Sequence, residues 1–240
     1  MSNEKLQESS KKLVTKVERL SKSLNRSERE NLKLLLSMAA GGILVGQADT
    51  ISPLQRTALE VAQRSLPLLQ SDRKKGFETG IVYLGKAPFF DEEDINALNI
   101  ESLKYRKQAE RFHDHYVASG APLARELALS QKLHSFLVEN VGEVYPTYKA
   151  NYLYYDEPGL GIDPHVDKHD FSLNVLTMLS HTSSPRNSKL ILYPPGQDQQ
   201  VIQLNPGETL VFFADSVTHQ RTRTVEGEKI RLVSFGYKTL

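Results

Sequence analysis

Cysteine is absent from this sequence of 240 residues. Its absence excludes disulfide bonds, thiolate metal ligands and cysteine nucleophiles, so that any metal must be bound by nitrogen and oxygen atoms. An excess of one charge is also missing, because 30 basic residues stand against 29 acidic ones and leave a net charge of +1. Proteins that read nucleic acids usually carry a strongly basic domain or face, and a nucleic-acid partner is therefore not favoured.

Long apolar runs are missing as well. The most apolar stretch, residues 34–45, is shorter than the about 20 residues that a membrane-spanning helix needs, and it contains Gly41 and Gly42. The first residues are polar and lack the apolar run and the small-residue cleavage site of a secretory signal. We therefore expect a cytoplasmic protein without a membrane partner.

Helical patterns dominate the first part of the chain. Residues 1–26 are polar and carry a narrow apolar stripe, which predicts a partly helical segment. Residues 27–144 are expected to form a helical region that packs on the core and supports it. Capping signals predict its helices near Ser27 and Ser52, a β segment follows at 80–84 and an acidic first turn at 91–93, and periodic apolar residues predict longer helices over 100–118 and 122–141.

The pattern changes from Tyr145 onward. Short runs of β-branched and aromatic residues are separated by turns rich in Gly, Pro, Asp and Asn. This arrangement is typical of a β-sandwich or a β-barrel. The sequence therefore predicts the α+β class, with residues 145–240 as a β-rich core that forms one integrated domain with the preceding helices.

Three side chains in the β-rich half form a candidate metal site. His165 and Asp167 are two residues apart, a spacing that places both side chains on one face of a strand. His219 follows the apolar run of a later strand. Two imidazoles and one carboxylate on one face of a metal, with the other positions open, are typical of non-haem iron(II) oxygenases. The alternative is a surface ion pair between His165 and Asp167, with His219 at a turn.

Residues 145–240 resemble the Fe(II)- and 2-oxoglutarate-dependent oxygenases, in particular the prolyl-hydroxylase-like branch. The resemblance rests on the order Tyr155, His165-x-Asp167, the Pro-Gly-Glu turn before an apolar strand at 205–213, His219 and the segment 227–235. It implies a double-stranded β-helix of the jelly-roll or cupin kind. It also implies Fe(II), 2-oxoglutarate and O2, with hydroxylation of a C–H bond in a small molecule or amino acid and release of succinate and CO2.

The resemblance also implies a basic residue that binds the distal carboxylate of 2-oxoglutarate. Lys229 and Arg231 lie ten and twelve residues after His219, and both would share one strand face. We favour Arg231, because its planar guanidinium matches a carboxylate with two hydrogen bonds. Tyr155 occupies the position at which relatives often place a tyrosine against the same carboxylate, although a tyrosine of the core fits the pattern equally well.

Three other polar residues are candidates for positions near the metal. His169 shares the strand parity of His165, and Arg221 and Arg223 share that of His219. These three are candidate substrate-binding residues, with an exposed loop and surface salt bridges as the alternatives. The segment His113-Asp114-His115 is expected on a helix, where neighbours two residues apart diverge and cannot bind one ion together.

Two other functions remain alternatives to a small-molecule hydroxylase. A cupin-type isomerase or hydrolase would use the same three metal ligands without 2-oxoglutarate, and a protein hydroxylase of the prolyl type would act on a polypeptide. A β-helix without catalytic activity, whose helices bind a partner, is a further alternative. Formation of succinate in the presence of Fe(II) and O2 separates the oxygenases from the others.

Overall fold

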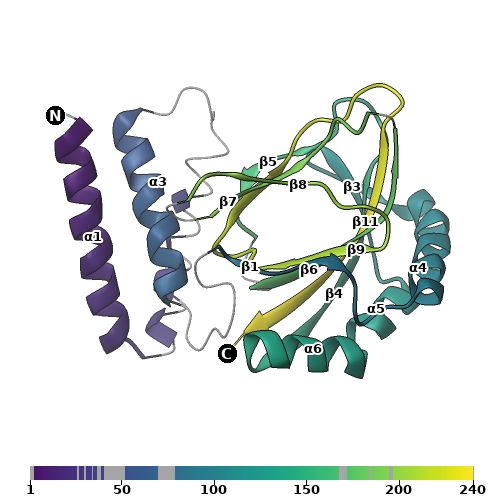
Figure 1. The fold of residues 1–240 in the computed structure, drawn as a ribbon, viewed down its shortest axis with the longest axis horizontal. Coiled ribbons are helices and arrows are strands. Elements are labelled where there is room, and N and C mark those ends of the chain that lie inside the picture. The colour runs from purple at the N-terminus through teal and green to yellow at the C-terminus, as the bar shows by residue number, and fades with distance from the viewer. Residues whose placement is uncertain are drawn as a thin grey trace.

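The structure is a computed structural model that describes residues 3–25, 27–29, 31–33, 35–36, 39–40, 52–69, 79–167, 172–183, 185–194 and 197–239. Two β-sheets face each other, and helices lie on two sides of them (Figure 1). One side carries α1 (Asn3–Ser23), α3 (Pro53–Ser65) and the 3-10 turn η1 (Leu66–Leu69). The other side carries α4 (Glu92–Tyr105), the 3-10 turn η2 (Arg106–Gln108), α5 (Pro122–Ala128) and α6 (Gln131–Val141).

Both sheets are antiparallel. The larger sheet has the order β1 (Ile81–Lys86), β9 (Glu208–Phe212), β6 (Leu173–Thr182), β11 (Lys229–Thr239), β4 (Val144–Tyr155), β3 (His115–Ser119) and β2 (Glu110–Phe112). The smaller sheet has the order β5 (Ile162–His165), β10 (Thr218–Arg221), β7 (Leu190–Tyr193) and β8 (Gln200–Ile202). Three strands of the larger sheet therefore come from the region before residue 144 that was expected to be mainly helical.

Alternation along β11 divides the interior into two cores, because successive side chains of a strand point to opposite faces. Ile230 and Leu232 lie in the inner core, between the two sheets. Val233 and Phe235 lie in the outer core, between the larger sheet and the helices. The inner core consists of Tyr155, Leu160, Leu176, Met178, Leu190, Leu192, Ile202, Leu204, Leu210, Phe212, Ala214, Val217, Ile230 and Leu232.

Helix α4 is fixed to the outer face of the larger sheet by two buried tyrosines of β4. The Tyr152 hydroxyl donates to a carboxylate oxygen of Glu101 at 2.7 Å, and the Tyr154 hydroxyl donates to the carbonyl of Ser102 at 2.8 Å. At the start of α4, the side chain of Asp91 accepts from the backbone N–H of residue 94. The acidic first turn expected at 91–93 is thus a helix start, and the helix extends to Tyr105.

Two expected helices were wrong in extent. The helix expected over 100–118 ends at Tyr105, and β2 and β3 form a hairpin whose turn contains His113 at a φ of 51°. The helix expected over 122–141 is two helices, because Ser130 starts α6 by accepting from the backbone N–H of residue 133. In both segments the helical spacing of apolar residues continues past the point where the helix ends. Only the turn-forming residues mark that point.

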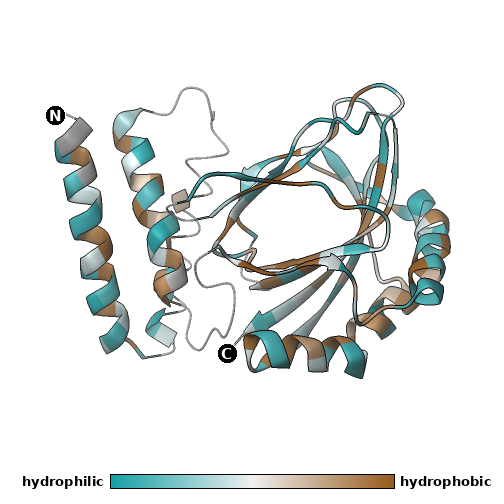
Figure 2. Cartoon of the chain, viewed as in Figure 1, coloured by the Kyte–Doolittle hydropathy of each residue, from teal (hydrophilic) through white to brown (hydrophobic). Residues whose placement is uncertain are grey.

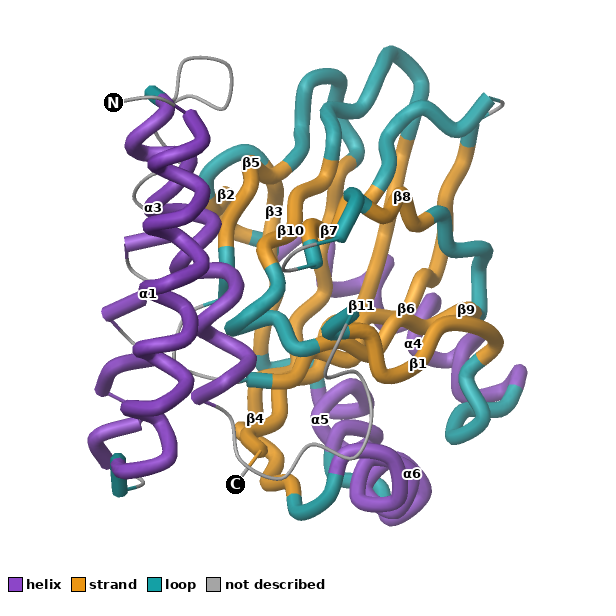
Figure 3. The backbone as a smooth tube through the Cα atoms, turned by 60° about the vertical axis from the view of Figure 1, so that its left-hand side comes forward, coloured by secondary structure: helices purple, strands orange, loops and turns teal. Residues whose placement is uncertain are grey.

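Helices α1 and α3 pack against each other (Figure 3), and α3 lies on the side of α1 that faces the sheets (Figure 1). The amide of Gln63 on α3 donates to the Thr218 hydroxyl on β10 at 2.9 Å, and a buried ion pair joins Lys33 to Asp215. Ser52 is the N-cap of α3 as expected, and together with Gln55 it forms a capping box. Polar and apolar residues alternate around α1 and α3 (Figure 2), and no described helix is long and apolar enough to cross a membrane.

Candidate metal centre and its surroundings

The structure brings His165, Asp167 and His219 together. His165 ends β5 and lies opposite His219 in the ladder between β5 and β10. The Nε2 atoms of His165 and His219 lie 3.4 and 3.5 Å from the same oxygen, Asp167 Oδ1. One ligand atom from each side chain lies within 4.8 Å of the others. Such spacing fits three adjacent ligands of one metal ion, which lie roughly 3 Å apart when bonds are about 2.1 Å long.

Hydrogen bonds on the far side of each imidazole orient its Nε2 atom. The Nδ1 atom of His165 donates to the carbonyl of Asp163 at 2.8 Å, and that of His219 donates to the carbonyl of Val217 at 3.0 Å. A proton on Nδ1 leaves a lone pair on Nε2 of the neutral ring. Metal-binding histidines are commonly oriented in this way. The donor set therefore fits a divalent metal and is not explained by a surface ion pair alone.

The protonation of Asp167 and of His165 is shifted by their surroundings. Burial raises the pKa of Asp167, but His219 and His165 outweigh burial and hold this pKa well below its ordinary value. Burial lowers the pKa of His165, but the hydrogen bond and the charge of Asp167 raise it above its ordinary value. Asp167 is therefore an anion at neutral pH. An ionised carboxylate is the form that binds a metal.

Asp167 is held by the chain around it and not by a strand. It lies two residues beyond the end of β5, although the sequence placed it on one strand with His165. Its backbone N–H donates to the carbonyl of Ala214 at 2.8 Å. The Asn174 side chain donates to its second carboxylate oxygen, Oδ2, at 3.2 Å. These two bonds replace the strand ladder and keep Oδ1 directed at both imidazoles.

A second polar group lies beside His165, Asp167 and His219, which we call the metal triad. Arg221 is two residues after His219 on β10, and its side chain is almost fully buried with a residue exposure of 4%. Its guanidinium carbon lies 5.3 Å from the ring centre of Tyr155, so that the two side chains are in contact. Burial lowers the pKa of Arg221, which Tyr155 and Glu228 oppose. Among the described residues, no carboxylate forms a salt bridge with Arg221.

His115 is a buried residue beside Tyr155 that the sequence interpretation missed. It is 3% exposed on β3, and its ring stacks on Tyr155 with 5.3 Å between ring centres. Burial and the nearby His165 lower its pKa to about 4, so that the ring is neutral at pH 7. The segment had been placed on a helix, where His115 would be solvated. Tyr116 and Val117 after Asp114 favour a strand, but two such residues are too few to distinguish a strand from a helix.

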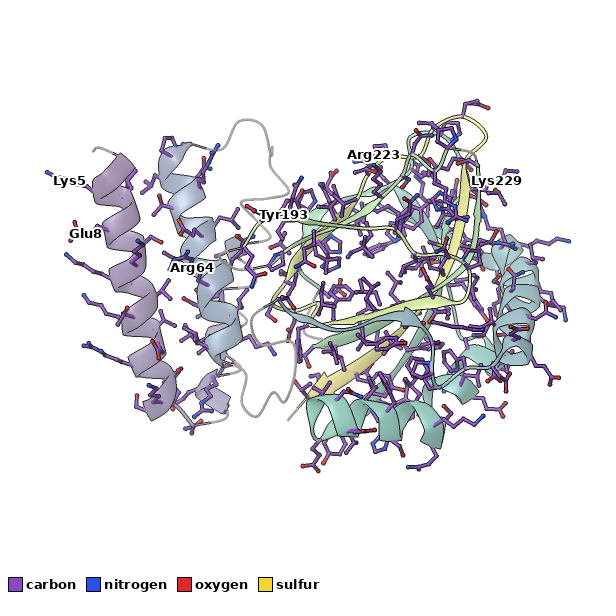
Figure 4. All side chains as sticks on the ribbon, viewed as in Figure 1. Lys5, Glu8, Arg64, Tyr193, Arg223 and Lys229 are labelled. Atoms are coloured by element: carbon purple, nitrogen blue, oxygen red, sulfur yellow. The ribbon has the colours of Figure 1, made fainter. Side chains whose placement is uncertain are left out.

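Lys229 and Arg231, the expected anchors for 2-oxoglutarate, lie on the other side of the sheet. Both share the outer face of β11 with Val233 and Phe235, whereas the metal triad borders the inner core. Arg231 lies opposite Tyr154, and Lys229 is exposed. Figure 4 shows Lys229 near the start of β11. The structure therefore does not bring either residue to the metal triad.

Of the remaining candidates, Arg223 is engaged in salt bridges. Its guanidinium donates to Asp114 at 2.7 Å and to Asp163 at 2.6 Å (the residue is labelled in Figure 4). It thus ties the β2–β3 hairpin to β5, next to the carbonyl that orients His165. His169 lies outside the described residues.

Comparisons with known proteins find no matching family model and no matching curated protein. Solved structures do match. The 2-oxoglutarate-dependent epimerase SnoN from nogalamycin biosynthesis has a TM-score of 0.58 and 14% identity, over 68% of this chain and 78% of that one. HygX from Streptomyces hygroscopicus, with nickel, 2-oxoglutarate and hygromycin B bound, has a TM-score of 0.53 and 15% identity, over 68% and 84%.

A prolyl-4-hydroxylase from Pseudomonas putida also matches, with a TM-score of 0.51 and 14% identity over 65% of this chain and 92% of that one. At these identities the likeness concerns the fold. The double-stranded β-helix with N-terminal helices that the sequence predicts is confirmed, and this chain has the fold that Fe(II)- and 2-oxoglutarate-dependent oxygenases share.

Proposed function

We propose that this protein is an Fe(II)- and 2-oxoglutarate-dependent oxygenase that hydroxylates a small molecule. The observation that carries the proposal is the geometry of His165, Asp167 and His219: one carboxylate oxygen faces two Nε2 atoms whose rings are oriented by backbone carbonyls. Two imidazoles and one carboxylate form the ligand set typical of non-haem iron(II) oxygenases. Iron there, with 2-oxoglutarate and O2, supplies the oxidation of an unactivated C–H bond, with succinate and CO2 as products.

We further propose that Arg221 and Tyr155 bind the distal carboxylate of 2-oxoglutarate, in place of Arg231 and Lys229. A buried guanidinium without a carboxylate partner is costly, and an anionic ligand would compensate for it. Arg221 shares the inner face of β10 with His219, and residues two apart on a strand lie roughly 6.6 Å apart. A five-carbon dicarboxylate can span from the metal triad to this guanidinium. The Tyr155 ring lies beside the Arg221 guanidinium, and its hydroxyl can donate to the same carboxylate.

The substrate we propose is a small molecule. HygX has hygromycin B bound and SnoN has been solved with nogalamycin RO, and both share this fold. The near-neutral charge of the chain does not favour a nucleic acid. His115 borders Tyr155 and lies near the metal triad, so a neutral imidazole is available there to contact a ligand.

The test is 2-oxoglutarate turnover by the purified protein. Anaerobic addition of Fe(II) and 2-oxoglutarate should give a visible charge-transfer absorption band, and exposure to O2 should give succinate. His165→Ala, Asp167→Ala and His219→Ala should each lose the band and the succinate while remaining folded. A panel of metabolites that contains antibiotics, sugars and amino acids is then screened for faster succinate formation.

The same measurements separate the alternatives. A cupin-type isomerase or hydrolase would bind the metal but would show no band with 2-oxoglutarate and no succinate. A prolyl-type protein hydroxylase would form succinate faster with proline-containing peptides than with any metabolite. Either result would overturn the corresponding part of the proposal.

A further inference from the structure

Asn174 forms the middle of a buried hydrogen-bonded chain that ends on the candidate metal ligand Asp167. Asn174 is 7% exposed on β6, and its Nδ2 atom donates to Asp167 Oδ2 at 3.2 Å. Its Oδ1 atom accepts from the hydroxyl of Ser234 on β11 at 2.8 Å. The direction of the chain is fixed by chemistry, because an ionised carboxylate only accepts and the Asn174 amide must therefore direct its NH2 group at Asp167.

The two oxygens of the Asp167 carboxylate consequently have different surroundings. Oδ1 faces the Nε2 atoms of His165 and His219, at 3.4 and 3.5 Å. Oδ2 faces away from that point and is occupied by the Asn174 amide. A carboxylate free to turn could offer both oxygens to one ion and fill an additional position. The hydrogen bond from Asn174 opposes this rotation.

We propose that Asn174, held by Ser234, is a positioning residue that makes Asp167 a ligand through one oxygen. This inference rests on the proposed function, since it assigns a role within the same metal site. By fixing Oδ1 toward the two histidines, the chain preorganises the three donors and leaves the remaining metal positions for cosubstrate. Hydrogen-bonding partners of metal ligands commonly change metal affinity by about 10-fold to 100-fold when they are removed.

A buried threonine on the same strand as Asn174 supplies the control. Thr177 is also on β6 and is fully buried, and its hydroxyl is hydrogen-bonded to that of Thr209 at 2.7 Å. Thr177 has the opposite strand parity to Asn174 and therefore lies on the outer face of the sheet. Thr177→Val removes a buried hydrogen bond from the same strand without touching the metal triad. It should lower the free energy of unfolding, as the loss of a buried hydrogen bond does, without changing Co(II) affinity.

The experiment measures Co(II) affinity by competition with a chelator, together with stability in urea, for the full chain and its variants. Asn174→Leu should weaken Co(II) binding by about 10-fold to 100-fold and alter the visible Co(II) spectrum. Ser234→Ala, which leaves the amide of Asn174 in place but frees it to turn, should weaken binding less and in the same direction. Thr177→Val should bind Co(II) as the wild type does.

Two results would overturn the inference. If Asn174→Leu and Ser234→Ala both keep the wild-type Co(II) affinity and spectrum, Asn174 has no positioning role. If Thr177→Val weakens Co(II) binding as much as they do, the effect is one of general stability. Failure of the proposed function is distinguishable from both, because the wild type would then show no charge-transfer band with Fe(II) and 2-oxoglutarate and no succinate, whatever its Co(II) affinity. Should Asn174→Leu fail to fold, Ser234→Ala alone decides the question.

Discussion

At the scale of single residues, the clustering of His165, Asp167 and His219 could be predicted from the sequence, but the face of the sheet on which Lys229 and Arg231 lie could not. The triad depends on residue type and on two strands that pair directly, so the pattern His-x-Asp followed by a later His was sufficient. The anchor depends on which face of β11 a residue occupies. Residues 222–228 connect β10 to β11 without forming a strand, and the turn at Gly227 has a positive φ of 75°. Counting residues from His219 therefore does not predict which face of β11 a residue occupies.

Arg221 provides the first prediction. Replacing it by Gln should raise the dissociation constant for 2-oxoglutarate by roughly 10-fold to 100-fold, since loss of a charge-assisted hydrogen bond costs about 1.5 to 3 kcal/mol. Arg231→Gln, on the outer face of the sheet, is the matched control and should leave this constant unchanged. Anaerobic titration of the charge-transfer band measures both. A large defect in Arg231→Gln with none in Arg221→Gln would return the anchor role to Arg231.

His115 provides a prediction of pH dependence. Its pKa in the folded protein is about 4, below the ordinary value of 6.5, so between these values the unfolded chain binds more protons than the folded one. The free energy of unfolding should therefore fall as the pH is lowered from 6.5 toward 4, by about 1 to 3 kcal/mol from this residue.

The corresponding measurement compares metal-free wild type with His115→Phe, which retains the stacking on Tyr155 and removes the titratable ring. Urea denaturation at pH 7 and at pH 5 gives the change in stability for each protein. Between pH 7 and pH 5 the free energy of unfolding should fall less in His115→Phe than in the wild type, because the variant lacks the titrating ring of His115. Equal decreases in both proteins would show that His115 is already protonated in the folded state or lies in a solvated position.

At the scale of elements, most strands of the C-terminal half could be predicted, whereas the hairpin at 110–119 could not. The runs after Tyr145 are short, apolar and bounded by turn residues, which leaves few alternatives to a strand. In the hairpin, charged residues surround Phe112 and Tyr116 at a spacing that also suits a helix. Whether this segment forms a strand depends on its pairing with β4, in which the paired residues are more than 30 positions apart in the sequence.

The attachment of the N-terminal helices gives a prediction at this scale. Lys33 and Asp215 are 6% and 5% exposed, and Asp215 lies four residues before His219. Lys33→Met would remove the cation of a buried ion pair, a change that costs about 3 to 5 kcal/mol. Urea denaturation should show this loss, and Lys33→Met combined with Asp215→Asn should recover part of it.

The exposed pair of Lys22 and Glu18 on α1 supplies the control. Its side chains are 74% and 48% exposed, and surface ion pairs contribute little. Lys22→Met should therefore leave the denaturation midpoint unchanged. If Lys33→Met does the same, the N-terminal helices are not held to the barrel by the ion pair.

At the scale of the whole molecule, the sheet order joins the two halves of the sequence. β1 pairs with β9, and β3 pairs with β4, so strands from before residue 144 cover both flanks of the C-terminal strands. A fragment of residues 145–240 would lack these partners and would expose the outer core. We expect it to be aggregated or poorly folded, as measured by light scattering and circular dichroism. A monomeric fragment that forms succinate at the wild-type rate would contradict this prediction.

The position of β11 has a consequence for synthesis of the protein. This strand, residues 229–239, lies between β4 and β6 and pairs with both. The larger sheet cannot close until those residues have left the ribosome, although β4 is translated about 75 residues earlier. A ribosome adds roughly 5 to 20 residues per second. The edges of β4 and β6 that pair with β11 therefore stay unpaired for several seconds after their synthesis. We therefore expect the nascent chain to bind chaperones during that interval, because its exposed apolar surface and unpaired strand edges favour aggregation.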